Sequence, residues 1–342
     1  MVSAAHKKLI AMLNEYDSLG IANQVDYSKY YLYSIITHST AIEGSTVTEI
    51  ENQLLFDEGI TSSKRTLLEQ MMNLDLKAAY EESIRLAGNH VDFSVDLLKR
   101  LSSIVMKNTG SEYSTALGAF SAAKGDLRLV NVSAGFGGPS YLSYQKVPAR
   151  LQEFCEWLNR QRHAIRKGDI VAAYNLSFDA HYRLVTIHPW VDGNGRMSRL
   201  VMNHLQFEFG LVPMKITKEQ KSEYIQALVD TREQEDESIF RRKMIDLHIR
   251  NLQAEIARYK KTSEDVFIGD TPANVTDVTE RQQAILDFIR ADKSISTTAI
   301  AERLQVSKRT VLRDIENLKS KDLLQRVGSE KTGHWEIIKD NR

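Results

Sequence analysis

The chain is poor in several residue types, beginning with cysteine. Its single cysteine, Cys155, excludes an internal disulfide and any metal site built from clustered cysteines. Only five prolines and 17 glycines occur among 342 residues, which favours helices over a loop-rich all-β fold. No apolar run approaches the ~20 residues of a membrane-spanning helix, and the N-terminus lacks the apolar segment of a signal peptide. These absences predict a soluble, mainly α protein of the cytoplasm.

An excess of charge of either sign is also missing. The 45 Lys and Arg residues balance 45 Asp and Glu residues, so no global field marks the chain as a nucleic-acid or membrane binder. The hydrophobic content of 42% and the charged content of 26% are ordinary for a globular protein. A length of 342 residues predicts two or three domains.

The most informative stretch is residues 188–199, which read HPWVDGNGRMSR. Pro189 disfavours a helix that continues through His188. Gly193 and Gly195 permit positive φ and a close approach of the backbone to a ligand. Apolar residues then recur at helical spacing. We therefore predict a glycine-rich loop that opens a helix.

This loop carries the groups that phosphate chemistry needs. The first turn of a helix presents unpaired N–H groups to an anion, and Arg196 and Arg199 project to the same side of it. Asp192 is a hard oxygen ligand suited to Mg²⁺. His188, with an ordinary pKa of ~6.5, is placed to accept a proton. Each feature alone has a simpler explanation as a turn, a solvated arginine pair or a structural histidine, but together they predict a phosphate site with a base beside it.

The run resembles the signature of the Fic (filamentation induced by cAMP) family, His-x-Phe-x-Asp/Glu-Gly-Asn-Gly-Arg-x-x-Arg, with Trp190 in place of phenylalanine. Members transfer AMP from ATP to a hydroxyl side chain of a target protein. The resemblance therefore implies a protein adenylyltransferase with a Fic-type helical bundle. It implies that His188 is the general base and that Asp192 holds Mg²⁺ against the α- and β-phosphates. The rest of the signature would bind the nucleotide: Gly193, Asn194, Gly195, Arg196 and, at the terminal phosphate, Arg199.

A second motif lies at residues 39–44, which read STAIEG. It resembles the Ser/Thr-x-x-x-Glu-Gly/Asn motif of the Fic subclass whose inhibitory helix is N-terminal to the core. The resemblance implies a salt bridge between Glu43 and Arg199 that keeps the resting enzyme weakly active. By itself the pattern is weak, because Glu43 could simply end a helix at Gly44. In some relatives the same glutamate helps to remove AMP, which leaves a second activity open.

Residues 125–128, GDLR, resemble the Gly-x-x-Arg that precedes the β-hairpin flap of the family. Residues 129–133 then predict a short strand and residues 135–139 a turn. In the family the flap aligns the backbone of the target by strand addition. The predicted edge consists of Val132, Ser133, Ala134 and Gly135; the alternative is an ordinary glycine-rich surface loop.

Residues 224–228, YIQAL, resemble the Tyr-Tyr-x-Ala-Leu stretch whose aromatic residues contact the adenosine. Tyr224 and Ile225 are the corresponding nucleotide-binding residues. Arg232 stands where relatives often have an asparagine near the nucleoside. Alternatively, Tyr224 belongs only to an amphipathic helix.

The C-terminal residues resemble a winged helix-turn-helix. Helices are predicted around residues 283–289, 297–304 and after Ser307, followed by strands at 324–328 and 335–338. From Thr279 onward, thirteen Lys and Arg residues face ten Asp and Glu residues, a net charge of +3. The outward side chains of the third helix would contact either the major groove of DNA or a protein partner: Lys308, Arg309 and Arg313.

The sequence thus predicts four segments: an N-terminal helical region with the inhibitory motif (1–94), the Fic catalytic core (95–260), a linker (261–278) and the winged helix-turn-helix domain (279–342). The expected partners are ATP, a target protein with a hydroxyl side chain, and DNA or a protein at the C-terminal domain; because relatives often dimerise, a homodimer is a further option. The alternative function is a DNA-binding regulator with a nucleotide-sensing Fic domain, or a transferase that uses another phosphate-containing donor.

Overall fold

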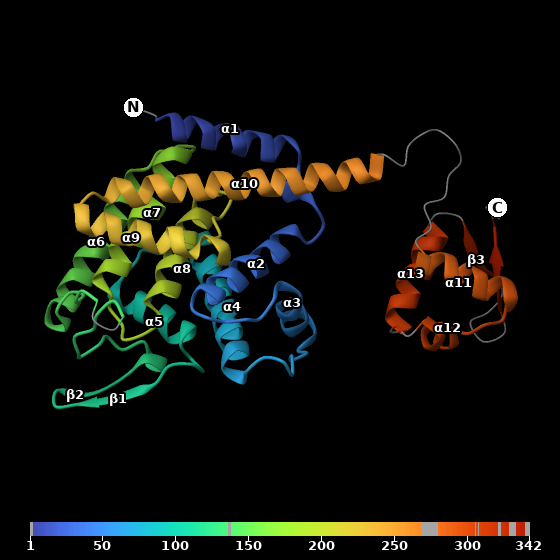
Figure 1. Cartoon of the computed structure of the whole chain (residues 1–342), viewed down its shortest axis with the longest axis horizontal. Helices are drawn as coiled ribbons and strands as arrows, with labels where there is room; N and C mark the ends of the chain where they lie inside the picture. Colours follow the sequence, from blue (N-terminus) through green and yellow to red (C-terminus); the bar gives the residue numbers. More distant parts are fainter. Residues whose placement is uncertain are drawn as a thin grey trace. The chain divides into compact units, whose positions relative to one another are not determined.

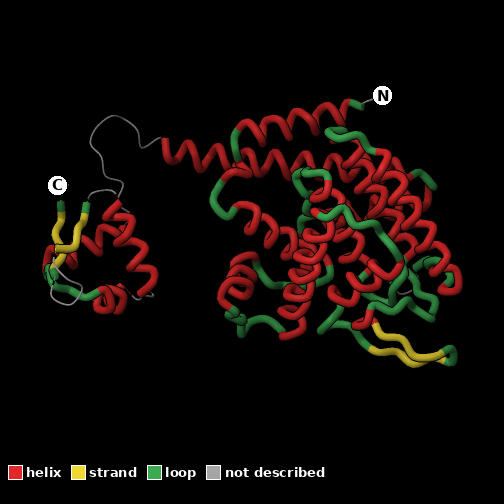
Figure 2. The backbone as a smooth tube through the Cα atoms, turned by 180° about the vertical axis from the view of Figure 1, so that it is seen from behind, coloured by secondary structure: helices red, strands yellow, loops and turns green. Residues whose placement is uncertain are grey.

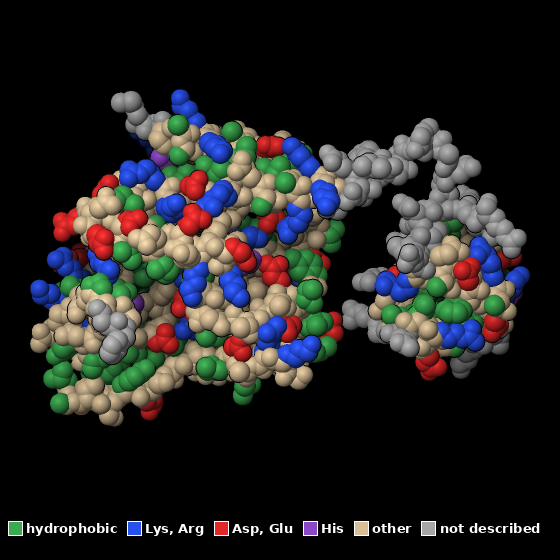
Figure 3. Space-filling model, viewed as in Figure 1, with side chains coloured by type: hydrophobic (Ala, Val, Ile, Leu, Met, Phe, Trp, Pro, Cys, Tyr) green, Lys and Arg blue, Asp and Glu red, His purple; other side chains and the backbone are tan. Residues whose placement is uncertain are grey.

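A computed structural model describes residues 3–135, 138–267, 280–304, 306, 308–320, 323–327 and 333–338. The chain forms two compact units, Met1–Ser263 and Glu264–Arg342. None of the described helices is both long and apolar enough to cross a membrane. Side chains of both charges are mixed over the visible face of the first unit, in keeping with the zero net charge (Figure 3).

The first unit is a helical bundle (Figures 1 and 2). Its helices are α1 (Ala4–Ser18), α2 (Tyr27–Ile42), α3 (Glu49–Glu58), α4 (Leu67–Gly88), α5 (Val95–Val105), α6 (Val147–Ala164), α7 (Ile170–Ile187), α8 (Asn194–Glu208), α9 (Lys221–Gln234) and α10 (Glu237–Phe267). Short 3-10 turns occur at η1 (Ile21–Asn23), η2 (Ala122–Lys124), η3 (Tyr144–Lys146) and η4 (Lys218–Gln220). The predicted mainly α fold is therefore confirmed.

Helix α8 lies at the centre of this bundle and packs on α7 and α4. Its apolar residues Met197, Leu200, Val201 and Leu205 are fully buried, and so are most of its polar residues. A buried polar side chain needs a partner. Asn203 has three: its amide donates to Gln206 Oε1 at 2.9 Å and to the backbone oxygen of Met214 at 2.8 Å, and its Oδ1 accepts from the Tyr80 hydroxyl at 2.7 Å. The helix that follows the glycine-rich loop is thus held on every side.

The strand predicted at residues 129–133 is wrong as a strand. The described residues there form one isolated antiparallel bridge, Ser133 with Ser140, extended by a hydrogen bond from Tyr141 N to Val132 O at 3.0 Å. The two-stranded hairpin of this unit lies upstream, where β1 (Glu112–Thr115) pairs antiparallel with β2 (Gly118–Ser121). Half of the residues in these strands are exposed, and no alternation of apolar residues marked the strands in the sequence.

The second unit contains α11 (Glu280–Ala291), α12 (Thr297–Leu304), α13 (Lys308–Ser320) and the antiparallel pair β3 (Leu324–Val327) and β4 (His334–Ile337). This is the predicted winged helix-turn-helix. It has its own core, in which the indole of Trp335 donates to the backbone oxygen of Ile295 at 3.1 Å. Although Lys308, Arg309 and Arg313 belong to α13, their side chains lie outside the described part of the chain. The segment predicted as a linker begins inside α10, which continues to Phe267.

Candidate functional site

His188 follows the last residue of α7 in a left-handed conformation, with φ 52°. Its backbone N–H donates to Leu184 O at 3.1 Å, which ends the helix. The ring places Nδ1 3.2 Å from Val185 O, so Nδ1 carries the proton and Nε2 is left as the acceptor. The imidazole stacks on Tyr141, with 3.8 Å between the ring centres and 14° between the planes. Nothing in the sequence distinguished Tyr141 from other aromatic residues.

Two effects keep the imidazole neutral. Burial lowers the pKa of His188 to about 4, and the guanidinium of Arg128 acts in the same direction. Arg128 also donates from Nε to the backbone oxygen of His188 at 2.7 Å and from Nη1 to Val130 O at 2.8 Å. Arg128 therefore connects the flap segment, at Val130, with His188. A neutral imidazole with a free Nε2 can accept a proton at neutral pH.

The loop after His188 is fixed from inside. Both ends of the Asn194 side chain bind the backbone of Trp190: its Oδ1 accepts from N at 3.1 Å and its Nδ2 donates to O at 2.9 Å. The fully buried indole of Trp190 donates to Gly125 O at 3.2 Å. Asn194 therefore shapes the loop, and its side-chain amide is already engaged. Gly193 caps α8 with φ 82°, and a Cβ there would lie 2.7 Å from Met106 Sδ.

Arg196 supplies unsatisfied donors at the N-terminus of α8. Its side chain is 3% exposed, and Nε and Nη1 have no hydrogen-bond partner among the described residues. The nearest carboxylate is Asp192, whose Oδ1 lies 3.6 Å from Nη2. Burial lowers the pKa of Arg196, which reflects the cost of keeping this cation out of water. A guanidinium in this state, beside the first turn of a helix, is suited to a phosphate.

Asp192 is the carboxylate that could hold a metal. Its side chain is 61% exposed, and one oxygen accepts from Gly193 N at 2.5 Å. Among the described residues no group of three or more His, Cys, Asp and Glu side chains forms a cage for an ion. A lone carboxylate suits Mg²⁺ that takes its other ligands from substrate phosphates and water, so the donor set fits that ion.

The ion pair expected between Glu43 and Arg199 is present. Glu43 lies at the end of α2, and its Oε1 accepts from Arg199 Nη2 at 2.5 Å. Arg199 also donates to the hydroxyl of Ser39 at 2.8 Å and to its backbone oxygen at 3.0 Å. Burial raises the pKa of Glu43, but the nearby Arg199 outweighs it and holds the pKa below its usual value. A Cβ on Gly195 would lie 2.5 Å from the same Oε1, so the carboxylate sits directly against this glycine.

A buried polar network holds the end of α2 in place. Asn73 of α4, fully buried, accepts from Thr40 Oγ1 and from Asn52 Nδ2, each at 2.8 Å, and donates to Ser45 Oγ at 3.2 Å. These bonds flank Glu43 on both sides in the sequence. Because buried hydrogen-bonded amides are costly to disrupt, they fix the position of the carboxylate.

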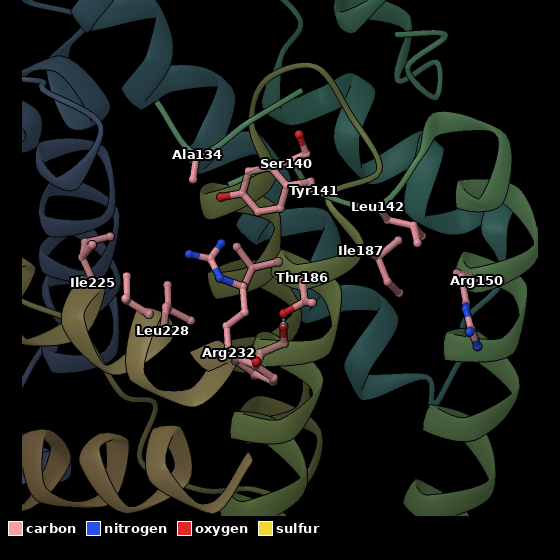
Figure 4. A pocket seen from close by; sticks show the side chains of 13 residues that line it. Ala134, Ser140, Tyr141, Leu142, Arg150, Thr186, Ile187, Ile225, Leu228 and Arg232 are labelled. Carbon is pink, nitrogen blue, oxygen red and sulfur yellow. Dashed lines mark hydrogen bonds between the residues drawn. The ribbon is translucent and has the colours of Figure 1, made fainter. Parts of the chain in front are cut away.

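A cavity of about 380 Å³ is lined by Tyr141, whose ring stacks on His188, and by Ile187, the residue before His188 (Figure 4). The lining includes Ala134 of the flap, residues 140–142, which follow the flap, and Ile225 of α9. Tyr224 does not line this cavity: it is 1% exposed, its hydroxyl lies 3.0 Å from His181 Nε2, and it also forms a side-chain hydrogen bond with Arg199. Of the flap edge, Val132 is half-buried, whereas Ser133 and Gly135 are exposed. The target contacts of these residues remain predictions.

Comparison with known proteins finds similar sequences and folds. The Fic/DOC family matches residues 92–206, and the DeoR-like helix-turn-helix domain matches residues 281–328. The protein adenylyltransferase Fic of Drosophila grimshawi is 29% identical over 231 residues, which cover 64% of this chain and 43% of that protein. The namesake from Drosophila persimilis is 33% identical over 197 residues, covering 55% and 34%. The chain thus spans less than half the length of these curated relatives.

The fold has solved counterparts. A Fic domain containing signaling protein from Bacteroides thetaiotaomicron superposes with a TM-score of 0.62 at 20% identity, over 74% of this chain and 98% of the other. At this identity the likeness concerns the fold alone.

Proposed function

From the Fic/DOC domain that residues 92–206 form, we propose that the protein is an adenylyltransferase that Glu43 keeps inhibited. The observation that carries the proposal is the pairing of two groups at one loop. His188 has a neutral ring with a free Nε2, and Arg196 has buried donors without a partner. A base beside a vacant anion site is what nucleotidyl transfer to a hydroxyl requires.

The reaction follows from this arrangement. The hydroxyl oxygen of the target attacks the α-phosphorus of ATP, a new P–O bond forms, and the P–O bond to the β-phosphate breaks. Pyrophosphate leaves, and Nε2 of His188 takes the hydroxyl proton. Arg196 and the first N–H groups of α8 bind the phosphates, which is most of what such a reaction asks of the protein. Mg²⁺, held by Asp192, would neutralise phosphate charge when bound.

The nucleoside would occupy the cavity that Ile225 lines, and the target would add a strand to the flap edge at Val132, Ser133, Ala134 and Gly135. Stacking on Tyr141 holds the imidazole in one orientation. Tyr141 N donates to Val132 O, so a target strand that binds the flap edge also contacts the segment that orients the His188 ring.

Inhibition is electrostatic. The carboxylate of Glu43 occupies Arg199 and lies against Gly195, where the terminal phosphate would otherwise bind. Two anions cannot share one guanidinium without strong repulsion. Removal of AMP from the target by the same glutamate is the second activity that this geometry supports.

The test uses α-labelled ATP with MgCl₂. The full chain with Glu43→Gly should label itself, and the double variant with His188→Ala should not. Mass spectrometry of the labelled protein should find a 5′-AMP adduct on Ser, Thr or Tyr. Labelling that survives His188→Ala would remove the base from the mechanism.

The C-terminal domain supports a second, separate role in DNA binding, since residues 281–328 match a DeoR-like helix-turn-helix. Contacts by Lys308, Arg309 and Arg313 remain part of this proposal. A gel shift of the full chain on mixed-sequence DNA at low and high salt tests it, because phosphate contacts weaken steeply with salt. Absence of salt-sensitive binding would leave this domain to a protein partner.

A further inference from the structure

The cavity beside His188 contains a cation without a counter-ion. Arg232, near the end of α9, is half-buried and forms no hydrogen bond or ion pair with any described residue. Figure 4 shows its side chain pointing from α9 toward the ring of Tyr141, with Ile225 and Leu228 on one side and Thr186 on the other. The guanidinium therefore lies within the volume that the nucleoside is proposed to fill.

No residue that lines the cavity offers this cation a carboxylate, because the lining contains no Asp or Glu. Its polar side chains are Arg150, which pairs with Glu153 at 2.7 Å, and four neutral hydroxyl groups: Ser140, Tyr141, Tyr182 and Thr186. A guanidinium has five donors and no acceptor. The described part of the chain therefore leaves Arg232 without a charged partner, and its donors are available to a ligand that presents acceptors in this cavity.

Resting on the proposed function, we propose that Arg232 selects a 6-oxopurine nucleotide, so that GTP is a donor and is preferred over ATP. Guanine offers two adjacent acceptors, O6 and N7, to the two parallel N–H groups of an arginine. Adenine places its N6 amino group, a donor, where guanine has O6, so it meets the guanidinium donor to donor. An asparagine, with one donor and one acceptor, matches adenine instead.

The transfer step is the same for either nucleotide. The target hydroxyl attacks the α-phosphorus of GTP, the bond to the β-phosphate breaks, pyrophosphate leaves, and His188 takes the proton. Only the base differs. Arg232 is therefore a specificity-determining residue, and the reacting atoms are unchanged.

The experiment compares α-labelled GTP, ITP and ATP as donors for self-modification by the Glu43→Gly protein. A bidentate base contact predicts kcat/KM for GTP about tenfold above that for ATP. ITP carries O6 and N7 but no 2-amino group, so it should match GTP. Arg232→Asn should reverse the preference toward ATP. Arg232→Lys keeps the charge without the fork and should reduce the preference toward unity, and Arg166→Asn, on the exposed loop after α6, should leave it unchanged.

The outcomes separate this inference from the proposed function. Preference for ATP by the protein with Arg232 intact overturns the inference while transfer stands. A preference for GTP that ITP does not share, or that Arg232→Asn leaves unchanged, overturns it as well, because the base is then read by another group. If no nucleotide gives transfer, the proposed function fails, and calorimetric binding of GTP and ATP to the His188→Ala protein decides the selectivity directly.

Discussion

Replacing Glu43 with glycine should raise transfer and at the same time lower stability. In the inhibited state Arg199 is 3% exposed and its only carboxylate partner among the described residues is Glu43. Loss of the carboxylate frees the guanidinium for a terminal phosphate. It also leaves a buried cation whose remaining acceptors are neutral oxygens, those of Ser39 and the hydroxyl of Tyr224.

The magnitude follows from the exposure of the pair. A hydrogen bond to a charged group contributes about 1.5–3 kcal/mol, and the lower end applies because the side chain of Glu43 is 32% exposed and partly screened. An energy of about 1.5 kcal/mol corresponds to slightly more than tenfold in an equilibrium. We therefore expect self-modification to rise at least about tenfold. The same loss should lower Tm by roughly 3–6 °C, since 1 kcal/mol shifts a unit of this size by about 2–4 °C.

The assay pairs α-labelled ATP transfer with thermal unfolding in the presence and absence of MgATP. Because the terminal phosphate can replace the lost carboxylate at Arg199, MgATP should stabilise the Glu43→Gly protein more than the unchanged protein. Glu43→Gln is the matched control, since it keeps the volume and the acceptor oxygen but not the charge. It should show an intermediate gain in transfer.

Two results would refute the electrostatic account. One is transfer by Glu43→Gly that is no faster than that of the unchanged protein. The other is a pair of observations: Glu43→Gln gains as much transfer as Glu43→Gly, and MgATP stabilises the Glu43→Gly protein no more than the unchanged protein. The gain would then arise from a change at the end of α2 and not from the charge that Glu43 presents to Arg199.

The remaining predictions concern the base and the loop. Because burial lowers the pKa of His188 to about 4, the imidazole stays unprotonated above that pH, and kcat/KM of the activated protein should fall only as the pH drops through about 4. Tyr141→Ala admits water to the ring and should move this acid limb of the pH profile upward toward ~6.5. An acid limb that does not move would mean that Tyr141 does not shield His188 from water. Gly193→Ala should lower the free energy of unfolding in urea by at least about 1–2 kcal/mol, because φ is 82° and the new Cβ would lie 2.7 Å from Met106 Sδ. Gly44→Ala is the control: φ is 106° but no atom lies near the new Cβ, so this variant measures the backbone cost alone and should destabilise the protein less.

The loop that opens α8 could be predicted because its causes are local. Pro189, the positive φ of Gly193 and the helical spacing that follows are properties of neighbouring residues, and the structure begins α8 at Asn194 as they require. The pairing of Glu43 with Arg199, 156 residues apart, came from a motif resemblance. No local pattern in the sequence joins the two segments.

Other features depend on contacts that the sequence does not display. The strand predicted at residues 129–133 is wrong because the segment pairs at a single bridge, Ser133 with Ser140, while Arg128 donates to the backbone oxygen of Val130 and holds the segment as an ordered loop. The amide of Asn194 is engaged with Trp190 because the indole is buried behind the loop, which its position in the motif could not reveal. The lack of a charged partner for Arg232 among the described residues likewise appears only once the cavity is assembled from four separate segments.

Gly195 links inhibition to nucleotide binding more closely than the motif alone suggests. Its φ does not lie in the left-handed region, so the need for glycine comes from space: a Cβ would lie 2.5 Å from Glu43 Oε1 and 3.1 Å from Arg199 Nη1. The Glu43 carboxylate lies against the backbone at this point, and a phosphate bound at a helix N-terminus needs the same close approach to the backbone. In the proposed mechanism the carboxylate of Glu43 takes the place of a phosphate, and inhibition is a competition between two anions for one site. Because the competing carboxylate is tethered and prepositioned by the Asn73 network, loosening Asn73 should weaken inhibition without touching the catalytic loop.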